Sequence, residues 1–194
     1  MIDAALAEEP WTFEKVEELE RRTGERFEFV AGAPRMMADG SEEHHLLEVE
    51  LTFQLQGQLV HDGDGRCRPF PSNAKVRVRD PSSGQFRYPD LSVFCGQREK
   101  HQGTETLFTN PTVLFEIVSP SSKTRDTTVK LGEYTAIPSL CAYVVVEQER
   151  KSVTFHERGE DGSWRAHTAV SGTHELRGIP ASLNIDQLYS VLVQ

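Results

Sequence analysis

Residues Thr112–Ser119 read TVLFEIVS, and this stretch decides the fold because it is almost wholly apolar yet contains one carboxylate, Glu116. A strand covered on both faces has such a continuous apolar run, so we predict a central strand here. A carboxylate inside that strand is costly to bury unless it is paired or bound to a metal. Glu116 is therefore the first candidate for a functional residue. The structural alternative is an ion pair at a strand end or a place beside a polar crevice.

A second strand is predicted at Tyr88–Phe94, YPDLSVF, where Asp90, Ser92 and Phe94 alternate with apolar residues. Pro89 fits the start or the edge of a strand. Two acids on neighbouring strands can converge at a sheet edge and hold a hard cation through their oxygens. Asp90 and Glu116 are thus a candidate pair, although a hydrogen bond from a turn would also explain an acid at a strand start.

A helix is predicted after the Glu116 strand, beginning at Thr124 or Asp126 and ending before Pro138, because the residue before proline disfavours helix. Asp126, Lys130 and Tyr134 are spaced at i, i+4 and i+8 and so share one face. Lys130 could therefore point towards the carboxylates. The alternative is a surface ion pair between Asp126 and Lys130, which stabilises a helix only slightly.

The other segments predict further helices and strands. Thr12 is a suitable N-cap and Gly24 a suitable end for a helix over residues 13–22. A hairpin follows with Gly32 at its turn, where a positive φ is expected. Ser41 can cap a long helix over residues 42–59, for which we predict a sheet-facing set: Leu46, Val49, Phe53, Leu55 and Leu59.

Residues 74–79 alternate and predict a half-buried strand with a polar face made of Lys75, Arg77 and Arg79. Residues 140–147 and 151–157 predict two strands joined by a polar turn, and a short helix is possible near residues 185–190. The fold class is therefore α/β with a mixed (α+β) arrangement: a central mixed sheet flanked by helices, preceded by an N-terminal helix and hairpin. We expect one domain over residues 1–194.

The net charge of −9 argues against a nucleic-acid partner, but the excess of acids lies entirely within residues 1–60, which weakens this argument. Residues 1–60 contain 5 Lys+Arg and 14 Asp+Glu, whereas the remainder contains 16 of each. Between residues 61 and 90 cations outnumber acids, and they could follow a phosphate backbone or form a solvated strand edge: Arg66, Arg68, Lys75, Arg77, Arg79 and Arg87.

Three cysteines, Cys67, Cys95 and Cys141, are widely spaced and odd in number. We therefore expect reduced, buried thiols and no disulfide framework. No apolar run reaches the roughly 20 residues that cross a bilayer. The first residues are acidic and lack a long apolar stretch, which predicts no secretory signal and a cytoplasmic protein.

The combination of Asp90, Glu116 and Lys130 suits the cleavage of a phosphodiester. That reaction needs an activated water, charge compensation at the phosphorus and a stabilised leaving oxygen. Mg²⁺ held by carboxylates meets much of this need. A lysine beside the carboxylates could orient or deprotonate the water or neutralise the transition state.

With these residues in place, the chain resembles the Uma-type restriction endonuclease family within the PD-(D/E)xK nuclease superfamily. The likeness runs from about Thr12 to Tyr189. It rests on RFEFVAG, His44, SNAKVRV, YPDLSVF, NPTVLFEIVSPSS, the D-x3-K-x3-Y pattern at 126–134, and IPSLCAYVVVEQERKSV. The ordered run from PD to IPSL is the specific part.

The resemblance implies a restriction-endonuclease-like core, Mg²⁺- or Mn²⁺-dependent nuclease chemistry on DNA, and a homodimer. It implies that Asp90, Glu116 and the backbone carbonyl of Ile117 bind the metal. Two residues after Glu116 stands Val118 and not lysine, so the catalytic lysine is expected at Lys130 on the following helix. Lys75 is the reserve candidate for that role.

Other residues are left open by the resemblance. An acid on the first core helix could join the site, and Glu43, Glu48 and Glu50 are all available. His44 could contact the site or a phosphate, or could only pack. The alternatives to a metal-dependent endonuclease are a catalytically silent module that binds nucleic acid or a protein partner, and a nuclease subunit that needs a DNA-reading partner.

Overall fold

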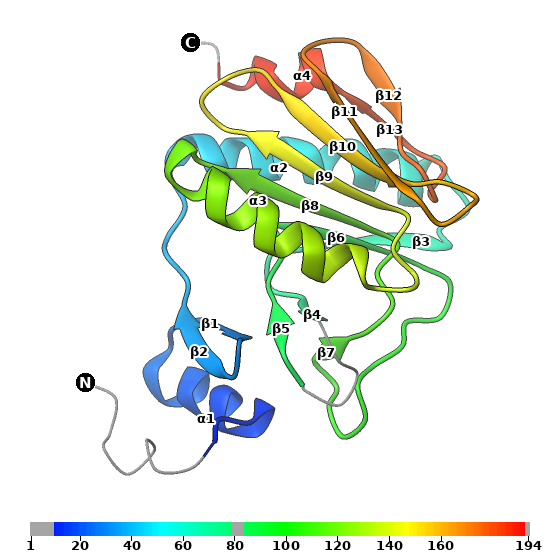
Figure 1. Ribbon diagram of the computed structural model, residues 1–194. Helices are drawn as coiled ribbons and strands as arrows, with labels where there is room; N and C mark the ends of the chain where they lie inside the picture. Colours follow the sequence, from blue (N-terminus) through cyan, green and yellow to red (C-terminus); the bar gives the residue numbers. More distant parts are fainter. Residues whose placement is uncertain (1–9, 79–83, 193–194) are drawn as a thin grey trace.

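The computed structural model describes residues 10–78 and 84–192, without the side chains of residues 120–127. Its largest sheet has six strands in the order β11-β10-β9-β8-β6-β3 (Figure 1). The strands are β3 (Cys67–Pro71), β6 (Leu91–Cys95), β8 (Val113–Val118), β9 (Ala142–Glu147), β10 (Val153–Arg158) and β11 (Trp164–Ala169). Strands β8 and β9 are parallel, whereas the other pairs are antiparallel. The predicted mixed sheet is confirmed.

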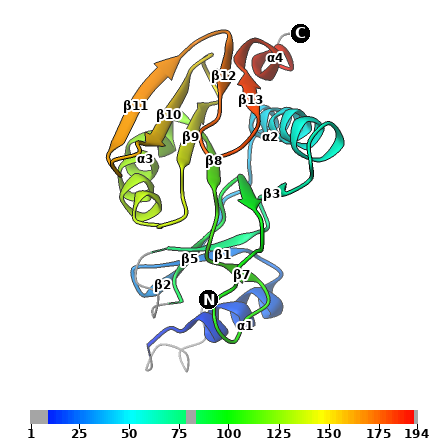
Figure 2. The ribbon, with the colours of Figure 1, turned by 90° about the vertical axis from the view of Figure 1, so that its right-hand side faces the viewer.

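Strand β8 lies inside this sheet and is buried along its whole length, as its apolar sequence predicts. Helix α2 (Glu42–Gln56) covers one face of the sheet and helix α3 (Pro120–Thr135) covers the other, which Figure 2 shows edge-on. Phe115 and Ile117 pack in the core on the α2 side, while Leu114 and Val118 pack in the core on the α3 side. Glu116 is two residues from both Leu114 and Val118, so its side chain lies on their face of the strand and points towards α3.

The predicted packing face of α2 is wrong at Leu46, Val49 and Phe53, which are exposed, whereas Leu55 is buried as expected. Leu47, Leu51 and Leu55, spaced at i, i+4 and i+8, are fully buried against the sheet. Val49 and Phe53 are instead 69% and 67% exposed. The helix carries two apolar stripes, and periodicity alone could not tell which one faces the core. Beyond α2 the chain continues as a π-helical turn over Gly57–His61 with Leu59 buried, as expected.

A second, smaller sheet has the order β2-β1-β5-β4-β7 and lies below the first in Figure 1. Its strands are β1 (Phe27–Val30), β2 (Ala33–Met36), β4 (Lys75–Arg77), β5 (Phe86–Arg87) and β7 (Leu107–Phe108). Ala31 and Gly32, at the predicted hairpin turn, both have positive φ, at 52° and 77°. This is the geometry that tight hairpin turns require.

Helix α1 (Phe13–Thr23) packs against the smaller sheet, and both of its predicted ends are confirmed. The Thr12 hydroxyl accepts a hydrogen bond from the Lys15 amide, and Gly24 takes the left-handed conformation. The predicted polar face of the β4 strand is wrong at Lys75, which is buried. Its ammonium contacts Glu17 and Glu20 of α1 at 2.9 and 2.8 Å, so ion pairing compensates its burial.

Helix α3 begins earlier than expected, at Pro120 and not at Thr124 or Asp126. Proline favours the first turn of a helix, where its missing N–H costs nothing. The helix ends at Thr135, and the Arg158 guanidinium donates to the Thr135 and Ile137 carbonyls there. Helix α3 therefore contains both Lys130 and Tyr134, and it covers the sheet face on which Glu116 lies.

The C-terminal part adds a two-stranded sheet of β12 (Thr173–Glu175) and β13 (Ser182–Asn184), followed by helix α4 (Ile185–Ser190). The possible helix near residues 185–190 is therefore confirmed. Leu183, Ile185 and Leu188 join the core on the α2 side. Among the described residues, no helix is both long and apolar enough to span a membrane.

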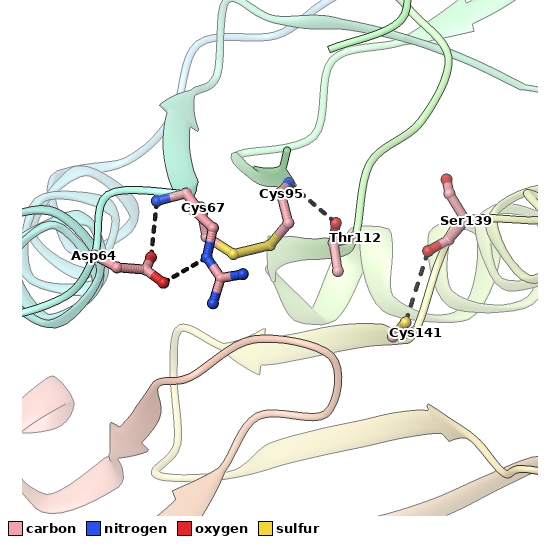
Figure 3. Close-up of a disulfide and its surroundings, with 7 residues drawn as sticks. Asp64, Cys67, Cys95, Thr112, Ser139 and Cys141 are labelled. Atoms are coloured by element: carbon pink, nitrogen blue, oxygen red, sulfur yellow. Dashed lines mark hydrogen bonds and ion pairs between the residues drawn. A yellow bond between two sulfur atoms is a disulfide. The ribbon is translucent and has the colours of Figure 1, made fainter. Parts of the chain in front are cut away.

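The expectation of three reduced cysteines is wrong, because Cys67 and Cys95 form a disulfide (Figure 3). They are directly opposite each other in the β3–β6 pairing, so the strand register brings them together. Only Cys141 keeps a free thiol among the three. Disulfides persist in oxidising compartments, whereas a cytoplasmic location predicts a reduced pair.

Replacing both Cys67 and Cys95 with serine should lower the free energy of unfolding. The bond joins residues separated by 28 positions, and closing a loop of that length stabilises a protein by up to about 3.6 kcal/mol in the chain-entropy account. We expect a matching fall in urea midpoint, and the same fall for the wild type in reducing agent. Cys141→Ser is the control: it keeps the disulfide, so its midpoint should stay close to that of the wild type and should fall in reducing agent as the wild type's does. An unchanged midpoint in the double variant would contradict this role.

Candidate active site

A cavity of about 450 Å³ lies beside the two predicted carboxylates. Its lining combines residues of the larger sheet and of helices α2 and α3 with the linker that joins β2 to α2 and with Arg26, Ser72 and Tyr88, which lie next to β1, β3 and β5. Among the residues that line it are His44, Glu48, Asp90, Glu116, Ile117, Ser119, Lys130 and Gln148. All three predicted catalytic residues, Asp90, Glu116 and Lys130, therefore line one cavity.

Asp90 is held at the point where the chain enters β6. Its Oδ2 accepts a 2.6 Å hydrogen bond from the Ile117 amide on the neighbouring strand β8. Its Oδ1 lies 3.1 Å from His44 Nε2, in the first turn of α2. The structure thus brings His44 to the site, which is the first of the three options that the sequence left open. Ile117 contacts Asp90 through its backbone N–H, and this hydrogen bond fixes the carboxylate beside strand β8.

Glu116 is held from α3 by two side chains. Lys130 Nζ donates to Glu116 Oε2 at 2.8 Å, and the Tyr134 hydroxyl donates to Oε1 at 2.7 Å. Lys130 and Tyr134 are one helical turn apart, so the predicted shared face is confirmed for these two. Lys130 points into the protein, with 8% exposure. The side chain of Asp126, the third member of the predicted face, lies outside the described residues.

Burial raises the pKa of Glu116 to about 7, even though the Lys130 ammonium opposes that rise, and the nearby Asp90 carboxylate adds to it. Burial alone would lower the pKa of His44, but the hydrogen bond and charge of Asp90 outweigh it, so the net shift is upward. Burial and the Glu116 carboxylate also raise the pKa of Tyr134, which keeps its proton for the hydrogen bond. Two of these perturbed groups, His44 and Glu116, line the cavity, and such clustering is typical of functional sites.

A buried ionic network, which the sequence did not reveal, lies beside Lys130. Arg87 of β5 donates to Glu28 Oε2 of β1 at 2.6 Å and to Glu133 Oε2 of α3 at 2.8 Å. Glu28 Oε1 lies 3.9 Å from Lys130 Nζ. The two carboxylates raise the pKa of Arg87 despite its burial, which by itself acts in the opposite direction. The network ties the smaller sheet to the helix that carries Lys130.

The structure distinguishes between the three acids considered on the first core helix, α2, because they have different surroundings. Glu48 lines the cavity one turn after His44. Glu43 is exposed, and Ser41 at the helix N-terminus lowers its pKa through a hydrogen bond. Glu50 accepts bonds from Gln54 and Gln187 on the α4 side. Lys75, the reserve lysine, is engaged by Glu17 and Glu20 under the smaller sheet and is not brought to the cavity.

The donor set fits a hard divalent cation. Asp90 and Glu116 offer carboxylate oxygens on one cavity, and each oxygen keeps a lone pair beyond its single hydrogen bond described above. No cluster of three His, Cys, Asp or Glu side chains surrounds one point within the described residues. Mg²⁺ needs no such cluster, because it is often bound by one or two carboxylates and keeps several waters. A cation would also favour the ionised form of Glu116, whose pKa is raised by burial first and by the Asp90 carboxylate second.

The chain is similar to known proteins over most of its length. Residues 13–186 match the family model "Uma2: Putative restriction endonuclease". Two uncharacterised proteins of Synechocystis sp. are similar: slr1290 is 28% identical over 171 residues, covering 88% of this chain and 86% of that protein, and sll1609 is 27% identical over 146 residues, covering 75% and 79%.

A crystal structure from Anabaena variabilis, titled "putative nuclease belonging to DUF820", has the same fold. Its TM-score is 0.72 at 16% identity, and the alignment covers 95% of this chain and 100% of that one. The restriction-endonuclease-like fold expected from the sequence is thus confirmed. Family and fold together indicate a nuclease.

Proposed function

Since the chain belongs to the Uma2 family of restriction-endonuclease-like proteins, we propose that it is a metal-dependent endonuclease that hydrolyses phosphodiester bonds of DNA. One observation carries the proposal: Asp90, Glu116 and Lys130, from two strands and one helix, line a single cavity. A surface ion pair between Asp126 and Lys130 would leave Lys130 exposed, whereas it is buried against Glu116. Mg²⁺ or Mn²⁺ is the proposed cofactor.

Asp90 and Glu116 are the proposed metal-binding carboxylates, with the Ile117 carbonyl as the further ligand that the resemblance implies. When bound, the cation would polarise the phosphodiester and lower the pKa of a bound water. His44 and the Ile117 amide keep the Asp90 carboxylate in one orientation. Tyr134 does the same for Glu116. Such preorganisation stabilises the transition state because the site needs no rearrangement during the reaction.

Lys130 is the proposed catalytic cation. Its ammonium lies on the cavity wall beside Glu116, where positive charge can stabilise the charge that develops on the phosphoryl oxygens. The cavity is otherwise rich in acids, since Asp39 and Glu48 line it as well as the two proposed ligands. A polyanionic substrate therefore requires the cations of the site to offset repulsion. A homodimer and a cytoplasmic location stay predictions of the resemblance and of the composition.

The proposal is tested by incubating the purified protein with supercoiled plasmid and with single-stranded DNA in Mg²⁺, Mn²⁺ or EDTA. We expect nicking of the plasmid or cutting of the single strand with either metal, and no product with EDTA. Restoring excess metal after EDTA should restore cleavage. Folded protein that binds DNA without cutting it in either metal would favour the silent binding module.

A further inference from the structure

The face of the smaller sheet that points away from α1 carries two buried charged residues. Phe27 and Phe29 of β1 belong to the core that packs against α1, and so does Phe86 of β5. Because side chains alternate along a strand, Glu28 and Arg87 lie on the opposite face. They are only 7% and 3% exposed. The smaller sheet therefore presents a carboxylate and a guanidinium to the interior of the protein.

Glu28 has a cation on each side. Its Oε2 accepts a 2.6 Å hydrogen bond from Arg87, and its Oε1 lies 3.9 Å from Lys130 Nζ on α3. Arg87 already has a second carboxylate, because it also donates to Glu133 Oε2 at 2.8 Å. One guanidinium between two carboxylates leaves negative charge in the interior, and buried charge is costly without compensation. The Lys130 ammonium offsets that charge from the other side of Glu28.

Lys130 therefore lies between two carboxylates that differ in their access to the cavity. Glu116 of β8 accepts its hydrogen bond at 2.8 Å and lines the cavity. Glu28 of β1 is a little farther from the ammonium and does not line the cavity. A metal ion or a substrate in the cavity can thus contact Glu116 and Lys130, whereas Glu28 stays behind them.

A metal ion bound by Glu116 changes the balance between these two carboxylates. The ion competes for the negative charge of Glu116 and repels the neighbouring ammonium, and such repulsion is strong where water is scarce. The attraction of Lys130 to Glu116 is then weaker. Glu28 keeps its charge for the lysine, since it lies outside the cavity and its other oxygen is fixed by Arg87.

We propose that Glu28 is a positioning residue, which holds the Lys130 ammonium beside the reacting centre while Glu116 binds the metal. The inference rests on the proposed endonuclease function, in which Glu116 is a metal ligand and Lys130 stabilises the transition state. It gives the smaller sheet a part in catalysis, because β1 supplies this carboxylate. In the alternative, Glu28 is only a counter-ion for Arg87.

NMR of protein labelled with ¹³C and ¹⁵N in lysine tests the position of the ammonium without DNA. The Lys130→Met variant identifies the Lys130 signal, which is missing from its spectrum. In the wild type, we expect this signal to stay distinct from those of exposed lysines when Mg²⁺ is added. In Glu28→Gln it should differ little without metal, because Glu116 still accepts the hydrogen bond. Mg²⁺ should then move it towards the exposed lysines.

Calorimetry with Mg²⁺ on the same samples keeps the two proposals separable. If the wild type binds Mg²⁺ and the Lys130 signal responds identically in both proteins, the positioning role is overturned and the endonuclease proposal is not. If the wild type binds Mg²⁺ but cuts no DNA, the endonuclease proposal fails. The different responses of the two spectra would then still support the contact between Glu28 and Lys130.

The cleavage reaction gives a second readout. Glu28→Gln should lower the single-turnover rate at saturating DNA by about 10- to 100-fold, since a displacement of roughly 1 Å in a reacting group can cost about 100-fold. The affinities for DNA and for Mn²⁺ should change little, because Glu28 is assigned to neither. A fall in either affinity with an unchanged rate at saturation would contradict the positioning role.

Glu133→Gln is the matched control. It also removes one of the two buried carboxylates that Arg87 contacts, yet it leaves Glu28 beside Lys130. Any loss of stability should therefore be similar in the two variants. The response of the Lys130 signal to Mg²⁺ should change in Glu28→Gln and stay like the wild type in Glu133→Gln, with a much smaller loss of rate. Equal effects of both variants on the signal and on the rate would show that Glu28 acts only through Arg87, which would overturn the proposal.

Discussion

Replacing Lys130 with methionine is expected to slow metal-dependent DNA cleavage by about 100- to 10,000-fold, the range typical for a positioned proton-transfer or charged group. The change removes the ammonium that lies 2.8 Å from Glu116 and keeps a side chain of similar length. The single-turnover rate on the preferred DNA substrate is the measurement. Most of the loss should appear in that rate and little in substrate affinity, because the ammonium is assigned to the transition state.

The Lys130→Met protein should remain folded. Loss of the ammonium leaves Glu116 buried, but burial already raises the pKa of this carboxyl to about 7. It can therefore take up a proton and avoid carrying an unpaired charge in the interior. The Tyr134 hydroxyl still donates to it. Thermal unfolding of the variant at pH 6 should accordingly stay close to that of the wild type.

Glu116→Gln is the companion variant that separates metal binding from catalysis. It keeps the size of the side chain and an oxygen acceptor for Tyr134 but loses the negative charge. We expect it to lose both Mn²⁺ binding, measured by calorimetry, and cleavage. Lys130→Met should lose cleavage and keep Mn²⁺ binding. If Lys130→Met cuts DNA at the wild-type rate, the lysine has a structural role only. The control is Lys100→Ala, which removes a lysine that pairs with Glu105 and does not line the cavity, and it should cut DNA at the wild-type rate.

The candidate site was predictable from local features. Glu116 in an apolar strand is costly to bury without a partner, whereas Asp90 beside a strand-start proline also had an ordinary explanation in a hydrogen bond from a turn, so the combination and not either acid alone indicated the site. Helical spacing then placed Lys130 and Tyr134 on one face. His44 came only from the resemblance, because a histidine at the start of a helix has no distinctive pattern. Its contact with Asp90 depends on how α2 crosses the sheet.

The features that the sequence did not reveal depend on long-range pairing. Cys67 and Cys95 meet through the β3–β6 register, which no local pattern encodes. The buried face of α2 could not be chosen, because both of its stripes are apolar and the sheet alone decides between them. Likewise, Lys75 alternates like a polar-face residue and is buried only because α1 supplies two carboxylates above β4.

Arg87 is the residue whose role in the structure differs most from the role that the sequence suggested. In the sequence it is one of six cations between residues 61 and 90 and was a candidate for contact with a phosphate backbone. In the structure it is 3% exposed and bridges Glu28 and Glu133. Its charge is therefore used inside the protein, where it joins β1, β5 and α3. It cannot contribute to DNA binding in this position.

Arg87→Met is expected to lower the free energy of unfolding by about 3–5 kcal/mol, because it removes the guanidinium that pairs with the buried carboxylates of Glu28 and Glu133. For a protein of this size, that loss corresponds to a melting temperature roughly 10 °C lower. Breaking a buried pair costs far more than the pair itself contributes, since the remaining charge has lost its solvation. Calorimetric or urea unfolding at pH 7 measures the effect.

The partners of Arg87 decide whether this explanation holds. A triple variant, Arg87→Met with Glu28→Gln and Glu133→Gln, removes the uncompensated charges and should recover most of the lost stability. Arg150→Met breaks an exposed pair with Glu147 and should change the melting temperature little. If the triple variant is no more stable than Arg87→Met, packing and not charge makes Arg87 important. Recovered stability with impaired cleavage would instead show that the Arg87 network, whose Glu28 lies 3.9 Å from Lys130, also helps to position the proposed catalytic cation.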